Sequence, residues 1–214
     1  MLLQYSCATG AHSHGVGLRK KHPMESVDFN NMRRAMVDGQ LRTSGVTTPW
    51  VLAAMGALAR EDFAPGALRS AAYMDRALPL AGGRSLNPAV STALMLQAAE
   101  VEPDDSVLLV GTAGGYTATL LSKRVVDAVV IESVADLPDS IFSLIIIDGA
   151  IEYLPDSLLA TTRDGTRIVT GVVEAGVTRL ASGIARGGKV SLRPFSDTEI
   201  AALPEFAMTR EFVF

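Results

Sequence analysis

A short apolar run that leads directly into a glycine-rich turn constrains the fold of this chain most strongly. Residues 106–110 read Ser-Val-Leu-Leu-Val, residues 111–116 read Gly-Thr-Ala-Gly-Gly-Tyr, and a helical pattern then extends to about Val125. This order predicts a strand, a tight turn and a helix. Further strand-like runs follow at residues 126–132, 142–148, 167–173, 179–185 and 189–193. Apolar strands that alternate with helices are typical of a doubly wound, mostly parallel α/β sheet.

Helices are expected before the first strand of this sheet. Apolar residues recur at near-helical spacing over residues 27–41, and Thr48 followed by Pro49 predicts the N-cap and first residue of a helix through Leu58. A third helix is expected over residues 89–100, after a turn at residues 81–88.

The composition predicts one globular domain over residues 24–214. The chain has 214 residues, of which 48% are hydrophobic and 20% are charged. The first 23 residues differ, because they mix Gly, Ser and His with a basic cluster and lack the apolar core of a secretory signal. We interpret residues 1–23 as a disordered tail or an upstream start, with Met24 as the alternative first residue.

The positions of His and Cys exclude several kinds of chemistry. All three histidines and the single cysteine, Cys7, lie within residues 1–23. Residues 24–214 therefore cannot form a Ser/His/Asp triad, a Cys/His pair or a His or Cys metal site, and no metal is expected. A single cysteine also fits a cytoplasmic location, where disulfides are rare.

Charge and hydropathy argue against nucleic-acid and membrane partners. The net charge of the whole chain is −4, and residues 1–23 contribute only basic side chains, so the rest is more acidic still. Nucleic-acid binding relies on Lys and Arg to neutralise phosphates. No apolar stretch approaches the ~20 residues that a membrane-spanning helix needs.

The glycine turn carries the first indication of a ligand. Gly111, Gly114 and Gly115 would let backbone amides approach a ligand closely, and Glu132 ends the next predicted strand, where a carboxylate can accept hydrogen bonds from ribose hydroxyls. Ala113 stands where a dinucleotide fingerprint needs its second glycine. The pattern thus favours a single nucleoside such as S-adenosylmethionine over NAD. A plain strand-to-helix turn beside a solvated carboxylate is the alternative.

Several segments of the chain resemble the protein-L-isoaspartate O-methyltransferase family, particularly its divergent bacterial branch. The resemblance covers nearly everything from Phe29 onward and rests on residues 36–42, 60–65, 72–79, 107–116, 154–159 and 164–169. It implies a transferase that moves the methyl group of S-adenosylmethionine to the side carboxylate of L-isoaspartyl residues in damaged proteins, a form of protein repair. It also implies a Rossmann-like methyltransferase fold with extra N-terminal helices.

The resemblance assigns roles to individual residues. Gly111, Thr112, Ala113 and Gly115 fall on the family's methionine-binding loop, and Glu132 falls on its ribose-binding acid. The family places an acceptor-site hydroxyl just before a proline. In the turn of residues 84–88 Leu86 takes that position and Ser85 lies one residue away, so Ser85 is the candidate catalytic or acceptor-positioning residue, with a plain turn serine as the alternative.

Asp148 is a further candidate for cofactor contact. It ends the apolar run of residues 145–148, and the carboxyl end of a parallel strand faces the ligand crevice in such sheets. The family does not usually carry an acid here. Asp148 either contacts a ligand or caps the turn that follows.

The largest departure from the family is a deletion. Only nine residues, Ser133–Ile141, connect Glu132 to Phe142, where the family carries a helix, a third strand and an acid that recognises adenine. A helical crossover needs at least ~10 residues, whereas nine extended residues still reach ~30 Å. The sequence predicts a sheet without its usual third strand and helix, and an altered or weakened hold on S-adenosylmethionine. It also predicts an apolar edge that a second subunit in a homo-oligomer could cover.

Three functions remain open from the sequence. The leading one is methyl transfer to a damaged protein or peptide; the acceptor carboxylate is already ionised, so no general base is needed. The alternative is a catalytically degenerate relative that serves as a binding or assembly module, supported by the deletion and by Leu109, where the family usually has an acid. An NAD-dependent oxidoreductase is disfavoured by the missing fingerprint.

Overall fold

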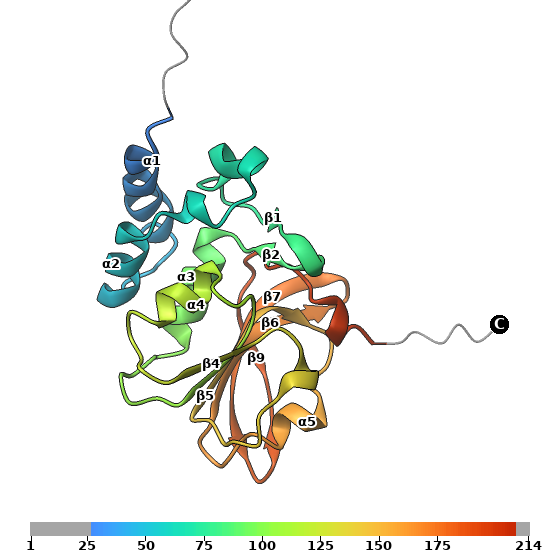
Figure 1. Ribbon diagram of the computed structural model, residues 1–214. Coiled ribbons are helices and arrows are strands. Elements are labelled where there is room, and N and C mark those ends of the chain that lie inside the picture. Colours follow the sequence, from blue (N-terminus) through green and yellow to red (C-terminus); the bar gives the residue numbers. More distant parts are fainter. Residues whose placement is uncertain (1–26, 209–214) are drawn as a thin grey trace, which may run out of the picture.

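The computed structural model describes residues 27–208 (Figure 1). Its α-helices are α1 Phe29–Met36, α2 Pro49–Ala57, α3 Ala89–Ala98, α4 Tyr116–Leu121 and α5 Asp156–Leu159. Its strands are β1 Leu78–Pro79, β2 Ser85–Leu86, β3 Val107–Val110, β4 Ala128–Ile131, β5 Leu144–Ile151, β6 Arg167–Glu174, β7 Val177–Arg186, β8 Lys189–Val190 and β9 Arg193–Ser196. Short helical turns are η1 Val37–Leu41, η2 Arg60–Asp62, η3 Gly66–Ala71, η4 Ala81–Gly83, η5 Val134–Asp136 and η6 Pro204–Phe206. The tail of residues 1–23 and the alternative start at Met24 lie outside the described residues.

The predicted parallel strands form one half of a seven-stranded sheet. The order is β4-β3-β5-β6-β7-β8, with β9 also paired to β7. β4, β3, β5 and β6 are parallel, in a register that pairs Val107 with both Ala128 and Leu144. The predicted Rossmann-like α/β fold, with a mostly parallel central sheet, is therefore confirmed.

The C-terminal strands differ from a parallel arrangement. β7 is antiparallel to β6, and β8 and β9 are antiparallel to β7. Only residues 175–176 join β6 to β7, and only residues 187–188 join β7 to β8. Two-residue links allow only antiparallel hairpins, because a connection between parallel strands needs a dozen or more residues. The run predicted as one strand at 189–193 is divided between β8 and β9.

Helices lie on both faces of the sheet. α3 and α4 lie against one face and α5 lies on the other (Figure 1). Side chains on the first face, including Leu109, Ile146 and Val169, join the helices in one apolar core, and Leu108, Ile145 and Leu158 belong to a second core on the opposite face. The alternation of side chains along each strand divides one apolar run between these two cores.

The helices expected before the sheet are present. α1 and α2 precede every strand, and Met36, Val51 and Met55 from them are buried in the first core. Thr48 is the N-cap of α2 as predicted, but its hydroxyl donates to Oε1 of Gln97 in α3 (3.0 Å) and does not cap its own helix. This bond ties the N-terminal helices to the helix beside the sheet.

The short link after β4 contains no third strand. Residues 133–141 include only the single turn η5, and within residues 27–208 β4 pairs with β3 alone, so β4 forms the edge of the sheet. Val134 and Leu137 from this link pack against the second core. Val129 stays 40% exposed and Ile141 49% exposed. The link therefore covers part of the apolar surface and leaves part of it open.

Candidate functional site

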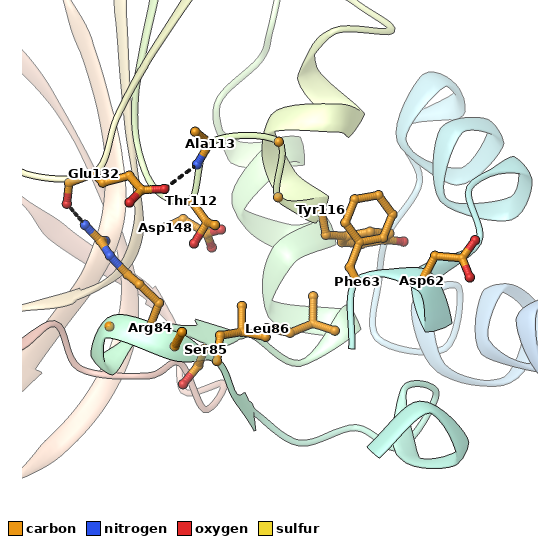
Figure 2. A pocket seen from close by; sticks show the side chains of 15 residues that line it. Asp62, Phe63, Arg84, Ser85, Leu86, Thr112, Ala113, Tyr116, Glu132 and Asp148 are labelled. Atoms are coloured by element: carbon orange, nitrogen blue, oxygen red, sulfur yellow. Dashed lines mark hydrogen bonds between the residues drawn. The ribbon is translucent and has the colours of Figure 1, made fainter. Parts of the chain in front are cut away.

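A cavity of about 550 Å³ lies where the carboxyl ends of β3, β4 and β5 face the hairpin of β1 and β2. Figure 2 shows the side chains that surround it. Six of the seven predicted site residues line it, namely Ser85, Thr112, Ala113, Gly115, Glu132 and Asp148. Gly111, the seventh, is buried and directly follows β3, and it does not line the cavity. The fold thus brings together residues that are up to 63 positions apart in sequence, from Ser85 to Asp148.

The loop between β3 and α4 depends on glycine at two positions. Gly114 adopts a positive φ of 67°, which side chains other than glycine rarely take. A Cβ on Gly115 would lie 2.8 Å from the carbonyl oxygen of Thr112. The loop can turn sharply only because both positions lack a side chain, and the turn leaves Thr112 and Ala113 at the cavity wall.

Glu132 joins this loop to the end of β4. Its Oε1 accepts a hydrogen bond from the backbone N–H of Ala113 at 3.0 Å (Figure 2). Its backbone carbonyl accepts one from Nη2 of Arg84 in the hairpin. Among the described residues, Oε2 of Glu132 has no hydrogen-bond partner. The carboxylate therefore holds the glycine loop with one oxygen and leaves the other for a ligand.

Asp148 lies in the cavity, although it does not end its strand. The pairing of β5 with β3 stops at Ile147, while β5 itself continues to Ile151 through an irregularity after Ile146. Asp148 thus occupies the first position beyond the β3 pairing, where its side chain reaches the cavity. The prediction of a strand ending at Asp148 was wrong because β6 goes on pairing with β5.

Asn87 fixes the Asp148 carboxyl. Nδ2 of Asn87 donates to Oδ1 of Asp148 at 2.8 Å and to its carbonyl oxygen at 3.2 Å. Burial raises the pKa of Asp148 above its ordinary value, although the side chains of Thr117 and Asn87 and the charges of Arg60 and Arg84 act in the opposite direction. A carboxyl of this kind keeps its proton to a higher pH than an exposed aspartate does.

Ser85 lies on β2 and lines the cavity. Among the described residues its hydroxyl has no hydrogen-bond partner. In Figure 2 the hydroxyl oxygen is turned away from the glycine loop, and Leu86 beside it is buried. A rotation about a single bond would be needed to aim this hydroxyl at a ligand on the glycine loop.

Sequence reasoning missed Asn87 and Arg84 as site residues. Asn87 is 2% exposed, and its Oδ1 also accepts from the backbone N–H of Ala201 at 2.9 Å. Arg84 forms an ion pair of 2.9 Å with Glu205 in addition to its bond with the carbonyl of Glu132. Both residues connect the hairpin to segments far along the chain, which no local pattern reveals.

A buried arginine supports the cavity wall. Arg60 is fully buried, its Nε donates to the carbonyl of Ala72 at 2.7 Å, and its Nη2 donates to the carbonyl of Asn87. Its guanidinium lies 4.8 Å from the ring centre of Tyr116. Burial lowers the pKa of Arg60, and burial raises the pKa of Tyr116 to about 12. Phe63 packs edge-on against Tyr116 with ring centres 5.3 Å apart.

The described part of the chain, residues 27–208, offers no cluster of three His, Cys, Asp or Glu side chains that could hold a metal ion. Within the same range, none of the helices is both long enough and apolar enough to span a membrane.

Comparison with solved structures identifies the fold. The chain superposes with a TM-score of 0.65 on a crystal structure described as a protein-L-isoaspartate O-methyltransferase of Plasmodium falciparum in complex with S-adenosyl-L-homocysteine. The two share 13% identity, and the match covers 81% of this chain and 98% of the other. A second structure of a protein-L-isoaspartate O-methyltransferase gives a TM-score of 0.66 at 14% identity, covering 81% and 67% of the two chains.

Comparison with curated sequences gives closer relatives. The chain is 41% identical over 106 residues to the protein-L-isoaspartate O-methyltransferase of Roseiflexus castenholzii, covering 50% of this chain and 48% of the relative. It is 27% identical over 199 residues to the enzyme of that name from Methanoculleus marisnigri, covering 80% and 90%. The match thus spans about half the length of the Roseiflexus relative and most of the Methanoculleus one.

The model of the family described as protein-L-isoaspartate(D-aspartate) O-methyltransferase matches residues 31–141. This range is more than half of the 214 residues and includes the hairpin, the glycine loop and Glu132. The chain therefore belongs to the protein-L-isoaspartate(D-aspartate) O-methyltransferase family.

Proposed function

We propose that this protein is a methyltransferase that transfers a methyl group from S-adenosylmethionine to the side carboxylate of L-isoaspartyl residues in damaged proteins. The observation that carries the proposal is the bond between Glu132 and Ala113. It holds the glycine loop at the wall of the same cavity that the β1–β2 hairpin encloses. A cofactor held by the loop and an acceptor held by the hairpin would then meet in one enclosed space.

The residues present fit S-adenosylmethionine, which supplies an activated methyl group when bound. Thr112, Ala113 and Gly115, which line the cavity, would hold its methionine part. Gly111 would support the loop from the end of β3, because its backbone N–H donates to the carbonyl of Ile131 at 2.8 Å. Oε2 of Glu132, free of protein partners among the described residues, would accept hydrogen bonds from the ribose. A cavity of about 550 Å³ is within the usual range for small-molecule sites. Because the link after β4 holds only the turn η5, it would leave the adenine with less protein around it, which supports an altered or reduced affinity.

The cavity provides what transfer to a carboxylate needs. The acceptor is already ionised near neutral pH, so orientation and exclusion of water are the main requirements. Phe63, Leu86 and Tyr116 supply apolar walls. We assign Ser85 to positioning the acceptor, because it lines the cavity on the hairpin and its hydroxyl is free of protein partners.

Asp148 is proposed to contact the bound ligands. A second carboxylate in the cavity would repel the acceptor if it were ionised. Burial raises the pKa of Asp148, which favours its protonated form and reduces this repulsion. The bond from Asn87 to Oδ1 leaves Oδ2 as the atom that can carry the proton.

The proposal implies damaged proteins or peptides as partners and a cytoplasmic location. The single cysteine of the chain agrees with a reducing compartment. Cell fractionation with an antibody to the protein tests the location.

Two measurements on the purified full chain test the proposed activity. Calorimetric titration with S-adenosylmethionine and S-adenosylhomocysteine measures binding, and transfer of labelled methyl to an isoaspartyl peptide measures turnover. The matched peptide with a normal aspartyl residue is the control acceptor. Saturable binding with transfer to the isoaspartyl peptide alone is the expected result. Equal transfer to both peptides would contradict the assigned substrate.

A second function, ligand binding without turnover, is favoured by one observation. The link of residues 133–141 has no third strand and leaves β4 at the edge of the sheet. Tight binding of S-adenosylmethionine with no transfer to either peptide would support a binding or assembly module. Absence of binding to either nucleoside would exclude both catalysis and cofactor holding.

A further inference from the structure

A second cavity, of about 840 Å³, lies at the other end of the sheet from the glycine loop. Its walls include the C-terminal end of α3, the first residues of β6, the last residues of β7, and residues of β8 and β9. In Figure 1 the turn between β7 and β8 lies at the far end of the sheet from the β1–β2 hairpin. The two cavities share no residue.

Four cationic side chains line this second cavity, namely Arg167, Arg186, Lys189 and Arg193. Glu100 is its one acidic lining residue. This excess of positive charge contrasts with the net charge of −4 of the whole chain. The sign of the local charge is therefore a property of this site and not of the protein surface in general.

The strand register places these cations on one face of the sheet. Arg167 of β6 pairs with Ile184 of β7, and Arg186, two residues further along β7, lies on the same face as Ile184. Lys189 pairs with Arg186 across the β7–β8 turn. Arg193 pairs with Ser182, which is two residues from Ile184 and also on this face.

The guanidinium of Arg167 already has hydrogen-bond partners within the protein. Its Nη2 donates to both carboxylate oxygens of Asp105 at 2.5 Å, and its Nη1 donates to the carbonyls of Ala99 (3.0 Å) and Glu100 (2.6 Å). Glu100 takes a left-handed backbone conformation with φ of 46°, which few residues other than glycine adopt. Arg167 thus closes the C-terminal end of α3 and forms a fixed wall of the cavity.

The other three cations have no such partners. Among residues 27–208, Arg186, Lys189 and Arg193 form no ion pair or side-chain hydrogen bond. The carboxylate of Asp164 lies near the β7–β8 turn, but it accepts a hydrogen bond from the backbone N–H of Gly187 at 2.7 Å and pairs with neither flanking cation. Within the described residues, three of the cations around the cavity therefore have no ion-pair partner, and Glu100 is the one acid beside them.

The pairing of Arg186 with Lys189 has an energetic cost. Like charges directly opposite each other on neighbouring strands destabilise a sheet, and an anion between them would remove this repulsion. Arg and Lys are also the side chains that bind phosphate and carboxylate groups most strongly.

The floor of the cavity is apolar. Val169 and Ile184 are its apolar side chains on the face that carries the cations, and Ile184 is 49% exposed between Arg167 and Arg186. Ile168 and Val190 also line the cavity, but their side chains alternate toward the opposite face and belong to the second core. An inorganic anion would leave this floor in contact with water, whereas a ligand with an apolar portion would cover it. The volume is within the range of small-molecule sites.

We propose that this second cavity binds a small multivalent anion, with phosphate or carboxylate groups held by Arg186, Lys189 and Arg193 and an apolar portion resting on Ile184. The site is separate from the glycine-loop cavity and stands whether or not the proposed methyl transfer is correct.

Calorimetric titration of the full chain tests the site with four probes: inorganic phosphate, pyrophosphate, citrate and octyl phosphate. The variant Arg186→Gln/Lys189→Gln removes the facing cations. Lys123→Gln is the matched control, since Lys123 is an exposed cation outside the cavity whose side chain has no partner among the described residues. We expect saturable binding of the multivalent probes and tighter binding of octyl phosphate than of phosphate. The affinity for these probes should fall about tenfold in the double variant and stay unchanged in Lys123→Gln. Affinity for S-adenosylhomocysteine should stay the same in both variants.

The unliganded double variant should also melt at a higher temperature than the natural chain, because the repulsion between Arg186 and Lys189 is gone. Amide shifts of Ser182, Ile184 and Arg193 on addition of citrate to the natural chain test the site without any substitution. No saturable binding of any probe, or an equal loss in the Lys123→Gln control, would overturn the proposal. Binding of a hexaglutamate peptide without binding of the small anions would overturn it in favour of a surface for acidic peptides.

Discussion

Nδ2 of Asn87 donates a 2.8 Å hydrogen bond to Oδ1 of Asp148 and thereby connects the turn before α3 to the middle of the central sheet. The same Asn87 receives the backbone N–H of Ala201 on Oδ1 and a guanidinium of Arg60 on its carbonyl. Through its amide side chain and its backbone carbonyl, this one residue ties the wall of the candidate site to three separate segments.

The raised pKa of Asp148 predicts a pH dependence of stability. A carboxyl whose native pKa exceeds its unfolded value binds its proton more tightly when folded. The stability that Asp148 contributes to the folded state is therefore fully present below about pH 3.9 and is lost as the pH rises through the native pKa. Asp148→Asn stays neutral and keeps an oxygen for Asn87. The unfolding free energy of the variant minus that of the natural chain, measured by urea unfolding, should therefore be larger at neutral pH than in acid. A stability difference that is the same at every pH would contradict the burial of an ionisable Asp148.

A second pH effect of opposite sign is expected at Glu61. Burial opposes its ionisation, but hydrogen bonds from Tyr73 and Arg33 outweigh burial and lower the pKa of Glu61. The Arg33–Glu61 pair, at 2.9 Å, has side chains that are 12% and 7% exposed. Glu61→Gln should cost about 2 kcal/mol of unfolding free energy at neutral pH. The cost should shrink as the pH falls below about 4.3, where the unfolded carboxyl becomes protonated.

The neighbouring pair provides the control for Glu61. Arg69 and Asp62 are 2.6 Å apart, but their side chains are 47% and 61% exposed. Asp62→Asn should change the unfolding free energy by less than about 1 kcal/mol. Equal costs for the two substitutions would argue against a special role of burial at Glu61.

Gly115→Ala should disrupt the glycine loop. The added Cβ would lie 2.8 Å from the Thr112 carbonyl oxygen, so the backbone must shift at a cost of about 1–3 kcal/mol. Binding of S-adenosylhomocysteine should weaken along with stability. Gly66→Ala is the control, because a Cβ there meets no atom within 4 Å. Thermal unfolding and calorimetry on both variants check the prediction, and a loop that tolerates alanine at Gly115 would refute it.

Glu132→Gln separates the structural role of this residue from ligand binding. The glutamine oxygen can still accept from the N–H of Ala113, so the melting temperature should hardly change. Loss of the charged acceptor should weaken S-adenosylhomocysteine binding by about tenfold or more. Asp136→Asn, an exposed acid in the same link, should leave the affinity unchanged. Unaltered affinity in Glu132→Gln would remove Glu132 from the site.

The open edge at β4 predicts self-association of the chain. The carbonyls of Asp127 and Ile131 accept from the backbone N–H groups of Val107 and Gly111. The backbone groups of Ala128 and Val130 therefore point outward and can pair with a second copy about Val129. Sedimentation over a range of protein concentrations should detect a dimer, and Val129→Lys should abolish it. Val177→Lys, at an exposed position on β7, is the control. A natural chain that stays monomeric throughout would contradict pairing at this edge.

Local patterns in the sequence determined the parallel half of the sheet, the glycine loop, the position of Glu132 and the absence of a third strand. Each of these depends on neighbouring residues: an apolar run fixes a strand, a turn that needs glycine fixes a loop, and nine residues are too few for a helical crossover. The family resemblance, carried by the same local segments, is confirmed by the family match.

Only the tertiary structure decided how distant segments meet at the candidate site. Three side chains form hydrogen bonds with groups that only folding brings near them, namely those of Arg60, Arg84 and Asn87. Their roles cannot be read from spacing along the chain. The antiparallel C-terminal strands likewise set Arg186 opposite Lys189, which follows from pairing register and not from either residue alone. Strand identity arises from local side-chain pattern, whereas pairing and contact across the sheet arise from the packing of the whole chain.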